Sequence, residues 1–427
     1  MPALWKQAVV LLAFVIAVLQ VIHMTLLSQL EGRKHKYEKS TSGNSADREN
    51  QDYQESTIRK DRAQMLKTVQ QNSVLDSSGE FQIINFLMRA ESLGSRNIVS
   101  QDLSIVTHTT VNHLHYLSTL SERWQGPMSV SVFAVTQGGS LAVESILYLR
   151  HCFPSIRYNT SFHLIYPLKN LSGETKIHQE KAPVFGSCDN ELNIVQHLNV
   201  PDNDVQEILY PNNLLRNVAR KNALTEYVFT IDIDLLPSSH LHTNFLTFAK
   251  ENRLFLDSHK DDKTVYVVHA FEVKKGTEVP AQKTSLIQLL ELMEARPFSL
   301  ELCWKCQKHT DYDAWEHEPQ APKLNVLFEV LWRDPWQPFY IARNTVPLYD
   351  ERFRQYKFNG ISQVCELHVA GYRFSVLNNA FLVHDGWKTT PSFHKSKDVE
   401  QERNRVLFRN FKAELQKKYP ESSRRCY

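Results

Sequence analysis

Two carboxylates that follow an apolar run are the residues best suited to chemistry in this sequence. Asp232 and Asp234 come directly after residues 227–231, whose apolar and aromatic side chains predict a buried strand. Because side chains alternate along a strand, carboxylates separated by one residue can face the same side and hold a hard divalent cation. Open α/β sheets bind ligands at such strand ends. The pair therefore predicts a metal site that bridges to a diphosphate, and the alternatives are a solvated strand end or a helix N-cap before Pro237.

A histidine much later in the chain is a third candidate metal ligand. His384 ends the apolar run 380–383, and imidazole suits Mn²⁺ beside carboxylates. On its own, any of the 18 histidines is more often a surface or core residue than a ligand. His384 gains its value from the pairing with the two aspartates.

A phosphatase of the haloacid class also begins from two aspartates after a strand. Its motif usually continues with Thr or Val after one further residue, whereas Leu235 and Leu236 follow here. Its nucleophile also lies on the first strand, whereas a long folded segment precedes Asp232. The diphosphate-binding metal site is therefore the favoured interpretation.

Basic and aromatic side chains supply further candidate contacts. Arg216 and Arg220 stand four residues apart, on one face of the helix that residues 213–224 predict. They could bind a phosphate or an acidic sugar, and the alternative is a solvated basic face. The aromatic stretch 331–340 offers flat faces of the kind that sugar rings favour, and core packing explains it nearly as well.

Alternating strand and helix patterns indicate the scaffold that positions these residues. Their alternation predicts an α/β fold with a mostly parallel central sheet. The expected strands are residues 129–136, 162–166, 227–231, 265–273 and 339–342. The expected helices are residues 141–150, 213–224, 285–295, 361–371 and 399–418.

Length and composition set the class of protein. The chain has 427 residues, of which 42% are hydrophobic and 11% aromatic, which excludes collagen-like and wholly disordered chains. Lys+Arg 49 against Asp+Glu 47 gives a net charge of +2. This lacks the basic excess of a phosphate-tracking protein, so nucleic acid is not an expected partner. The sequence predicts a folded globular protein.

The amino-terminal region predicts a membrane anchor. Residues 8–27 carry no formal charge and are long enough to cross a bilayer as a helix. A cleaved signal peptide is the alternative, although the apolar run exceeds the usual hydrophobic region of such a peptide and no clean cleavage site closes it. The expected organisation is a cytosolic tail at 1–7, a transmembrane anchor at 8–27, a flexible polar stem at 28–73 and a lumenal domain at 74–427.

Sequons and cysteines suit a lumenal domain. Asn159 and Asn170 each begin an N-x-S/T sequon, a weak signal on its own. Six cysteines allow 15 full pairings, and the sequence does not choose among them. Cys303 and Cys306 form a single CxxC. Because a second CxxC and a nearby His pair are lacking, a structural disulfide or buried thiols are favoured over zinc.

Seven stretches, in order along the chain, match a known family. They are residues 121–127, 210–217, 232–234, 334–336, 350–356, 365–371 and 381–384. On these stretches the chain, from about Val74 to Cys426, resembles the β-1,4-glucuronyltransferases, formerly named β-1,3-N-acetylglucosaminyltransferases. It is also similar to the glucuronyltransferase domain of LARGE.

The resemblance implies a fold, an activity and a compartment. The implied protein is a single-pass type II Golgi membrane protein with a lumenal catalytic domain of the GT-A fold. It would use Mn²⁺ to transfer glucuronic acid from UDP-glucuronate to a β-linked xylose in β-1,4 linkage. The product would prime the laminin-binding O-mannosyl glycan of α-dystroglycan, which LARGE-type enzymes extend. The implied partners are therefore that xylose-terminated glycan, LARGE-type glycosyltransferases and the Golgi membrane.

The same resemblance implies roles for particular residues. Asp232 and Asp234 would form the metal and UDP motif, and His384 would be the C-terminal metal ligand. Arg216 and Asn217 would contact the donor.

Inversion at the sugar calls for a general base on the acceptor hydroxyl. UDP-glucuronate is α-linked and the family product is β-linked, so the implied reaction is a direct displacement. Many inverting GT-A enzymes place an acid at a position that falls here on residues 358–360, which carry none. Glu366 is the first candidate base, with Asp350 and Glu351 behind it. The alternative for each is an exposed acid or a salt bridge.

A glucuronate donor also needs a cationic partner for its carboxylate. The sequence does not choose among the candidates, which are Arg216, Arg220, Arg343, Arg352 and Lys388.

Two other functions stay open. One is an N-acetylglucosaminyltransferase acting on poly-N-acetyllactosamine, and the other is a catalytically inert lumenal glycan-binding partner.

Overall fold

The computed structural model describes residues 55–94, 100–135, 138–168, 188, 208–355, 357–389 and 397–426. The chain divides into two compact units, Met1–Lys60 and Asp61–Tyr427, and the second carries every site discussed below. The expected anchor at 8–27 lies outside the described residues. Among the residues that are described, no helix combines the length and the apolar character needed to cross a membrane.

The second unit begins in what the composition predicted to be a flexible stem. Residues 61–71 are helical, and Met65 is completely buried. The Asp61 carboxylate pairs with Arg157 at 2.9 Å and with Arg150 at 3.4 Å. A single buried apolar side chain and a paired charge therefore hold this segment, although its average composition is polar.

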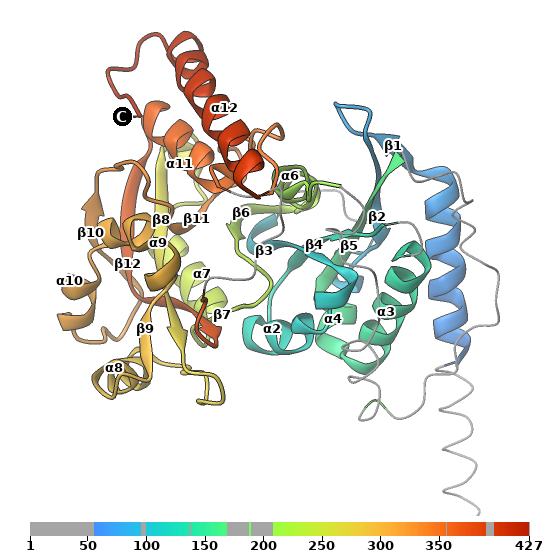
Figure 1. Ribbon diagram of the computed structural model, residues 1–427. Coiled ribbons are helices and arrows are strands. Elements are labelled where there is room, and N and C mark those ends of the chain that lie inside the picture. Colours follow the sequence, from blue (N-terminus) through green and yellow to red (C-terminus); the bar gives the residue numbers. More distant parts are fainter. Residues whose placement is uncertain are drawn as a thin grey trace, which may run out of the picture. The chain divides into compact units, whose positions relative to one another are not determined.

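One twelve-stranded sheet forms the centre of the unit, in the order β1-β2-β5-β4-β3-β6-β11-β8-β12-β10, with β7 paired to β12 and β9 paired to β8 (Figure 1). The strands are β1 (Ser73–Leu75), β2 (Phe81–Met88), β3 (Ser100–Thr110), β4 (Met128–Phe133), β5 (Thr160–Pro167), β6 (Thr225–Thr230), β7 (Leu235–Pro237), β8 (Thr264–Val273), β9 (Ala295–Pro297), β10 (Asn325–Val330), β11 (Phe339–Arg343) and β12 (Arg373–Asp385).

The sheet is mixed, which corrects the prediction of a mostly parallel sheet. Strands β5, β4, β3 and β6 run parallel, as alternating strands and helices require. Strand β11 then enters antiparallel to both β6 and β8, and β10, β7 and β9 also pair antiparallel. Among the strands from β11 to β10 in the sheet order, only β12 and β8 pair in parallel. The antiparallel pairs join strands that are far apart in the chain or separated by a helix, so local strand–helix alternation does not set their direction.

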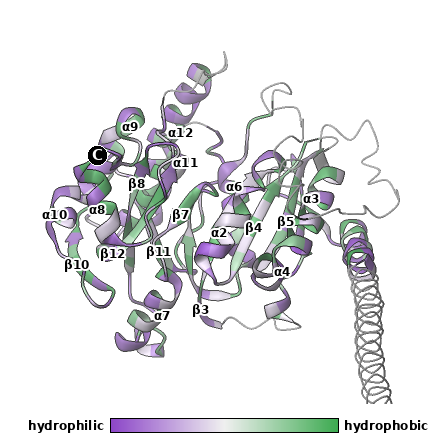
Figure 2. Ribbon diagram, turned by 90° about the horizontal axis from the view of Figure 1, so that it is seen from below, coloured by the Kyte–Doolittle hydropathy of each residue, from purple (hydrophilic) through white to green (hydrophobic). Residues whose placement is uncertain are grey.

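Helices cover the sheet, and each helix expected from the sequence is present with shifted ends. The helices of the sheet unit include α2 (Tyr116–Trp124), α3 (Gly138–Cys152), α4 (Pro154–Asn159), α6 (Asn212–Asn222), α7 (Leu241–Glu251), α8 (Lys283–Glu291), α9 (Leu300–Gln307), α10 (Tyr312–His317), α11 (Asn359–Val369) and α12 (Lys397–Lys418). Short 3-10 turns lie at η1 (Glu91–Leu93), η2 (Val111–His113), η5 (Asp257–His259) and η6 (Lys308–Thr310). Figure 2 shows hydrophobic colour along central strands and mixed colour on the outer helices.

Alternation along the strands separates two apolar cores. In β8, Val265 and Val267 pack in one buried cluster with residues of α11 and α12, whereas Tyr266 and Val268 pack in the other with residues of β3 and β6. Because successive side chains point to opposite faces of a sheet, the two clusters lie on opposite faces. The sheet is thus buried on both sides, and its strand ends are where polar side chains can collect.

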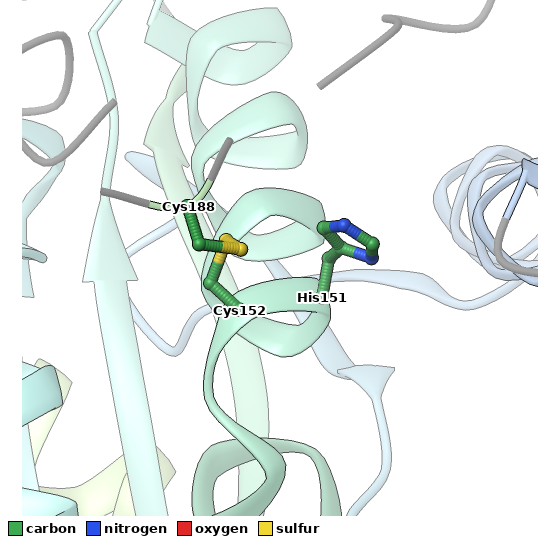
Figure 3. Close-up of side chains that lie close together, drawn as sticks. All are labelled: His151, Cys152 and Cys188. Atoms are coloured by element: carbon green, nitrogen blue, oxygen red, sulfur yellow. A yellow bond between two sulfur atoms is a disulfide. The ribbon is translucent and has the colours of Figure 1, made fainter. Parts of the chain in front are cut away.

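All six cysteines are paired, as Cys152–Cys188, Cys303–Cys306 and Cys365–Cys426. This confirms the preference for a disulfide over zinc at the CxxC. His151 lies beside the first disulfide (Figure 3), and its ring and the two sulfurs are close enough to suggest a metal site. Because both sulfurs are bonded to each other, they are not thiolates and do not form one.

Candidate active site

The two aspartates lie in the turn that connects β6 to β7. Strand β6 ends at Thr230, and β7 begins at Leu235, so Asp232 and Asp234 occupy the link between them. The backbone N–H of Leu235 donates to the carbonyl of Asp232 at 3.2 Å. The turn, rather than a continuing strand, therefore brings both carboxylates to the carboxyl end of β6.

Pairing between β7 and β12 brings His384 to the same place. His384 is opposite Leu235 in the antiparallel register, and its Nε2 lies 3.1 Å from Asp234 Oδ2. Its Nδ1 lies 2.7 Å from the carbonyl oxygen of Gly386. Because a carbonyl only accepts, Nδ1 carries the hydrogen, and Nε2 is the ring nitrogen that faces Asp234. The Gly386 carbonyl thus fixes the orientation of the ring.

Lys388 supplies positive charge at this carboxylate. Its Nζ lies 3.1 Å from Asp234 Oδ2. Burial alone would raise the pKa of Asp234, but the hydrogen bond from His384 and the charge of Lys388 outweigh it and hold that pKa well below its usual range. Burial in turn would lower the pKa of Lys388, and the charges of Asp234 and Asp232 raise it instead. Asp234 is therefore a carboxylate and Lys388 an ammonium.

The residues present fit a divalent cation. Among the described residues, Asp234 Oδ1 is a buried atom without a hydrogen-bond partner. A buried carboxylate oxygen without a partner is costly, and a metal ion would satisfy it. Two carboxylates and an imidazole whose other nitrogen is held by a backbone carbonyl form a donor set typical of Mn²⁺. Asp234 and His384 would be the first ligands and Asp232 would complete the set, although the three do not form a compact ligand group among the described residues.

A pocket of about 380 Å³, here called the Asp234 pocket, opens at this group. Both aspartates and Lys388 line it, together with Tyr210 and Gln355. Ile233 lies between the two aspartates, and the end of β3 and the segment after it supply the rest of the lining, which is His108, Thr109, Thr110, His113 and Tyr116. Since β3 and β6 are parallel neighbours, their carboxyl ends meet at this edge.

Sequence reasoning missed His108, which is a central polar group of this pocket. Its Nδ1 lies 2.9 Å from the hydroxyl of Tyr210, and its Nε2 is buried without a partner among the described residues. Burial and the positive charge of Arg216 hold the pKa of His108 well below its ordinary value, so the ring is neutral. The available signal was a polar residue following the apolar strand 103–106, the same signal that marked Asp232 and His384.

Comparisons with known proteins place the chain in a family. A family model described as "Glycosyl-transferase for dystroglycan" matches residues 102–420. Beta-1,4-glucuronyltransferase 1 of Danio rerio is 37% identical over 96% of each chain, and that of Homo sapiens is 39% identical over 86% of each chain. The chain belongs to this family of glycosyltransferases for dystroglycan. The resemblance predicted from the sequence is thereby confirmed.

More distant matches add context. Xylosyl- and glucuronyltransferase LARGE1 of Homo sapiens is 25% identical over 74% of this chain and 35% of that protein. Among solved structures, S. aureus TarS with UDP-GlcNAc is 13% identical over 72% of this chain and 65% of that one, with a TM-score of 0.35. GalNAc-T7 with UDP, GalNAc and Mn²⁺ is 8% identical over 76% and 59%, with a TM-score of 0.33. At these TM-scores the structural matches add nothing to the family assignment.

In this dystroglycan glycosyltransferase the two expected donor contacts on α6 point to different places. Arg216 Nη2 lies 3.9 Å from Asp232 Oδ1, next to the Asp234 pocket. Asn217 is buried, and its Nδ2 donates to the Tyr349 carbonyl and to Glu351 Oε1, each at 2.8 Å. Adjacent residues on a helix do not share a face, so only Arg216 reaches the aspartates.

Asn217 lines a second pocket, of about 590 Å³, here called the Asn217 pocket. Asp350 and Glu351, two of the candidate bases, line it as well. Asp350 pairs with Arg352 at 2.6 Å, and Glu351 accepts from Asn217. Neither of these acids is among the residues that line the Asp234 pocket. The structure thus does not bring these two candidates together with the aspartates.

Glu366, the first candidate base, lies on α11 with a side chain that is 4% exposed. Its Oε1 accepts from Lys418 Nζ at 2.7 Å and from the Tyr419 hydroxyl at 2.9 Å. The neighbouring Cys365 is bonded to Cys426. Glu366 is therefore part of the attachment of the C-terminal segment to α11, and it does not line the Asp234 pocket.

Three of the candidate cations have structural partners. Arg220 is 1% exposed and donates to the carbonyls of Asn344, Val346 and Pro347. Arg343 pairs with Glu226 and with the carbonyl of Leu254. Arg352 pairs with both Asp350 and Glu414 at 2.6 Å. Arg216 and Lys388 are the candidates beside the two aspartates.

The first sequon asparagine, Asn159, ends α4 and is half-buried, with the buried Thr160 directly after it in β5. The second, Asn170, lies outside the described residues.

Proposed function

We propose that this protein is a metal-dependent, inverting glucuronyltransferase. It moves glucuronic acid from UDP-glucuronate to a β-linked xylose and forms a β-1,4 linkage. The observation that carries the proposal is the convergence of His384 and Lys388 on Asp234, with one buried oxygen of that carboxylate left for a cation and Asp232 lining the same pocket. The activity named for the relatives at 37% and 39% identity, both beta-1,4-glucuronyltransferase 1, supports the choice of sugar.

The residues of the Asp234 pocket have different roles in binding a nucleotide sugar. Mn²⁺ bound by the two aspartates and His384 would supply charge that stabilises a departing diphosphate. Lys388 adds a fixed positive charge beside Asp234. His108, held by Tyr210, adds a neutral imidazole to the lining of the pocket. Donor and acceptor enter the same pocket, so the displacement is helped by orientation as well as by charge.

The proposal extends to the acceptor and the compartment. The acceptor would be the xylose-terminated O-mannosyl glycan of α-dystroglycan, in keeping with the description of the matching family. LARGE-type glycosyltransferases would extend the product. Three disulfides suit an oxidising lumen, and we therefore propose a single-pass type II Golgi membrane protein of the GT-A fold.

Donor choice is the sharpest test of this function. The full-length protein is incubated with Mn²⁺ and a β-xyloside, and transfer is measured from UDP-glucuronate, UDP-N-acetylglucosamine and UDP-xylose. We expect transfer from UDP-glucuronate alone, with loss of activity on adding a chelator. Transfer from UDP-N-acetylglucosamine would instead support the alternative activity, and no transfer by folded protein would support a binding role.

A further inference from the structure

Two cations stand beside the aspartates, and they differ in their partners. Lys388 is committed to Asp234 at 3.1 Å, at the end of the pocket where the metal ligands meet. Arg216 instead donates through Nη1 to two neutral amide oxygens, Asn213 Oδ1 at 3.0 Å and Asn359 Oδ1 at 3.1 Å. Neutral acceptors fix the direction of a guanidinium without neutralising its charge. Arg216 is thus held in place while its charge is available to a ligand.

Arg216 lines a small pocket of about 40 Å³. One water needs about 10–15 Å³ by such a measure, so the space suits a carboxylate-sized group rather than a whole sugar. Its lining includes Arg216, Asp232, Gln337, Tyr340, Tyr349 and Gly360. The Arg216 side chain is only 11% exposed, so a charge-assisted contact there would be largely shielded from water.

Gly360 and Gln337 set the size of this small pocket. A Cβ at position 360 would come within 2.2 Å of Gln337 Nε2. Any larger residue would therefore displace the amide that lines the pocket. The glycine leaves room for this amide, which packs directly against the first turn of α11.

Asp232 connects the small pocket to the Asp234 pocket, because it lines both. A nucleotide sugar whose diphosphate lies at Asp234 can therefore extend its sugar past Asp232 to Arg216. The contact between Arg216 and Asp232 is long, at 3.9 Å. A ligand carboxylate can accept from the guanidinium without breaking a short ion pair.

We propose that Arg216 is the residue that selects an acidic donor sugar, by binding the carboxylate of glucuronate in this small pocket. The inference rests on the proposed function and deepens it. Arg220, Arg343 and Arg352 are occupied by structural partners, and Lys388 serves the diphosphate end. Arg216 is a specificity-determining contact.

Binding preference tests this assignment without depending on turnover. Calorimetry with Mn²⁺ measures the affinities of UDP-glucuronate, UDP-glucose and UDP for the full-length protein. The two sugars differ in carrying a carboxylate or a hydroxymethyl group. We expect a native preference for UDP-glucuronate of about tenfold to a hundredfold, as for hydrogen bonds to charged groups. In Arg216→Gln this preference falls to near one, while UDP affinity changes much less.

Lys388→Met is the matched control, since it removes the other cation of the pair. It should weaken all three ligands together and keep the preference. Retention of the preference in Arg216→Gln, or its loss in Lys388→Met, would overturn the assignment. If Arg216→Gln does not fold, as judged by its melting temperature, Arg216→Met replaces it, and an unchanged preference there also overturns the assignment. A native protein that does not prefer UDP-glucuronate would contradict the proposed function itself.

Discussion

The Asp234 pocket and the Asn217 pocket differ in how their polar side chains are partnered. In the Asp234 pocket, Asp234 Oδ1 and His108 Nε2 are buried without partners among the described residues. In the Asn217 pocket, the amide of Asn217 bonds to Tyr349 at both its nitrogen and its oxygen, and Asp350 pairs with Arg352. Buried polar atoms are normally satisfied, so exceptions call for an explanation.

The comparison shows why size is a poor guide to the active site of this chain. The Asn217 pocket is the larger, at about 590 Å³ against 380 Å³. Its acids hold neighbouring segments together, whereas the acids of the smaller pocket keep capacity for a ligand. Between these two pockets, buried donors and acceptors without partners, rather than volume, distinguish the one where chemistry can occur.

The largest expected effect is in the Asp234 pocket. Asp234→Asn should lower the transfer rate about a thousandfold, because the several kcal/mol of charge stabilisation by a bound metal correspond to that factor. Steady-state transfer at matched Mn²⁺ and the melting temperature are the two measurements. Asp350→Asn is the matched control in the Asn217 pocket and should keep its rate within a few-fold. Equal losses in the two variants would abolish the distinction between the pockets.

His384 should show its role as a dependence on metal concentration. His384→Gln removes one ligand and leaves both aspartates, so the Mn²⁺ concentration for half-maximal transfer should rise by about tenfold to a hundredfold. Saturating Mn²⁺ should restore much of the rate. The measurement is a Mn²⁺ titration of native and variant protein side by side. An unchanged midpoint would remove His384 from the metal site.

Much of the Asp234 pocket could be predicted because its residues follow local patterns. Asp232 follows the end of β6 and His384 lies near the end of β12, and a strand end in an α/β sheet is a recognisable location. The parallel strands β4, β5 and β6 follow from continuous apolar runs. His108 obeys the same rule, but neither the strand that carries it nor its partner Tyr210 was anticipated.

The remaining features depend on contacts between distant residues. The mixed sheet arises because β11 pairs with β6 through Ile341 and Phe229, which no local pattern reveals. Arg216 and Asn217 are neighbours in one motif, yet the Arg216 side chain lies near Asp232 whereas the Asn217 amide bonds to Tyr349. A sequence motif predicts that such residues matter, whereas tertiary contacts decide what each one does.

Asn217 should affect stability more than catalysis. Asn217→Ala leaves the buried backbone groups of Tyr349 without partners, and this should lower the free energy of unfolding by about 2 kcal/mol. The affinity for UDP should change little. Denaturant unfolding gives the first quantity and calorimetry the second. A loss of UDP affinity with unchanged stability would restore Asn217 as a donor contact and weaken the contrast between the pockets.

Substitution of Glu366, an acid that lines neither pocket, should give the smallest effect on the transfer rate. Glu366→Gln keeps the shape of the side chain and an oxygen that can accept from Tyr419, but it removes the charge that pairs with Lys418. Because Lys418 is 60% exposed, water already screens that pair, and the loss of stability should be about 1 kcal/mol or less. A general base would behave differently, since an amide cannot take the proton of the acceptor hydroxyl and the transfer rate would fall by about a hundredfold or more. The rate of Glu366→Gln at several pH values therefore separates the two roles, and a native-like rate across that range identifies Glu366 as an anchor for the C-terminal segment.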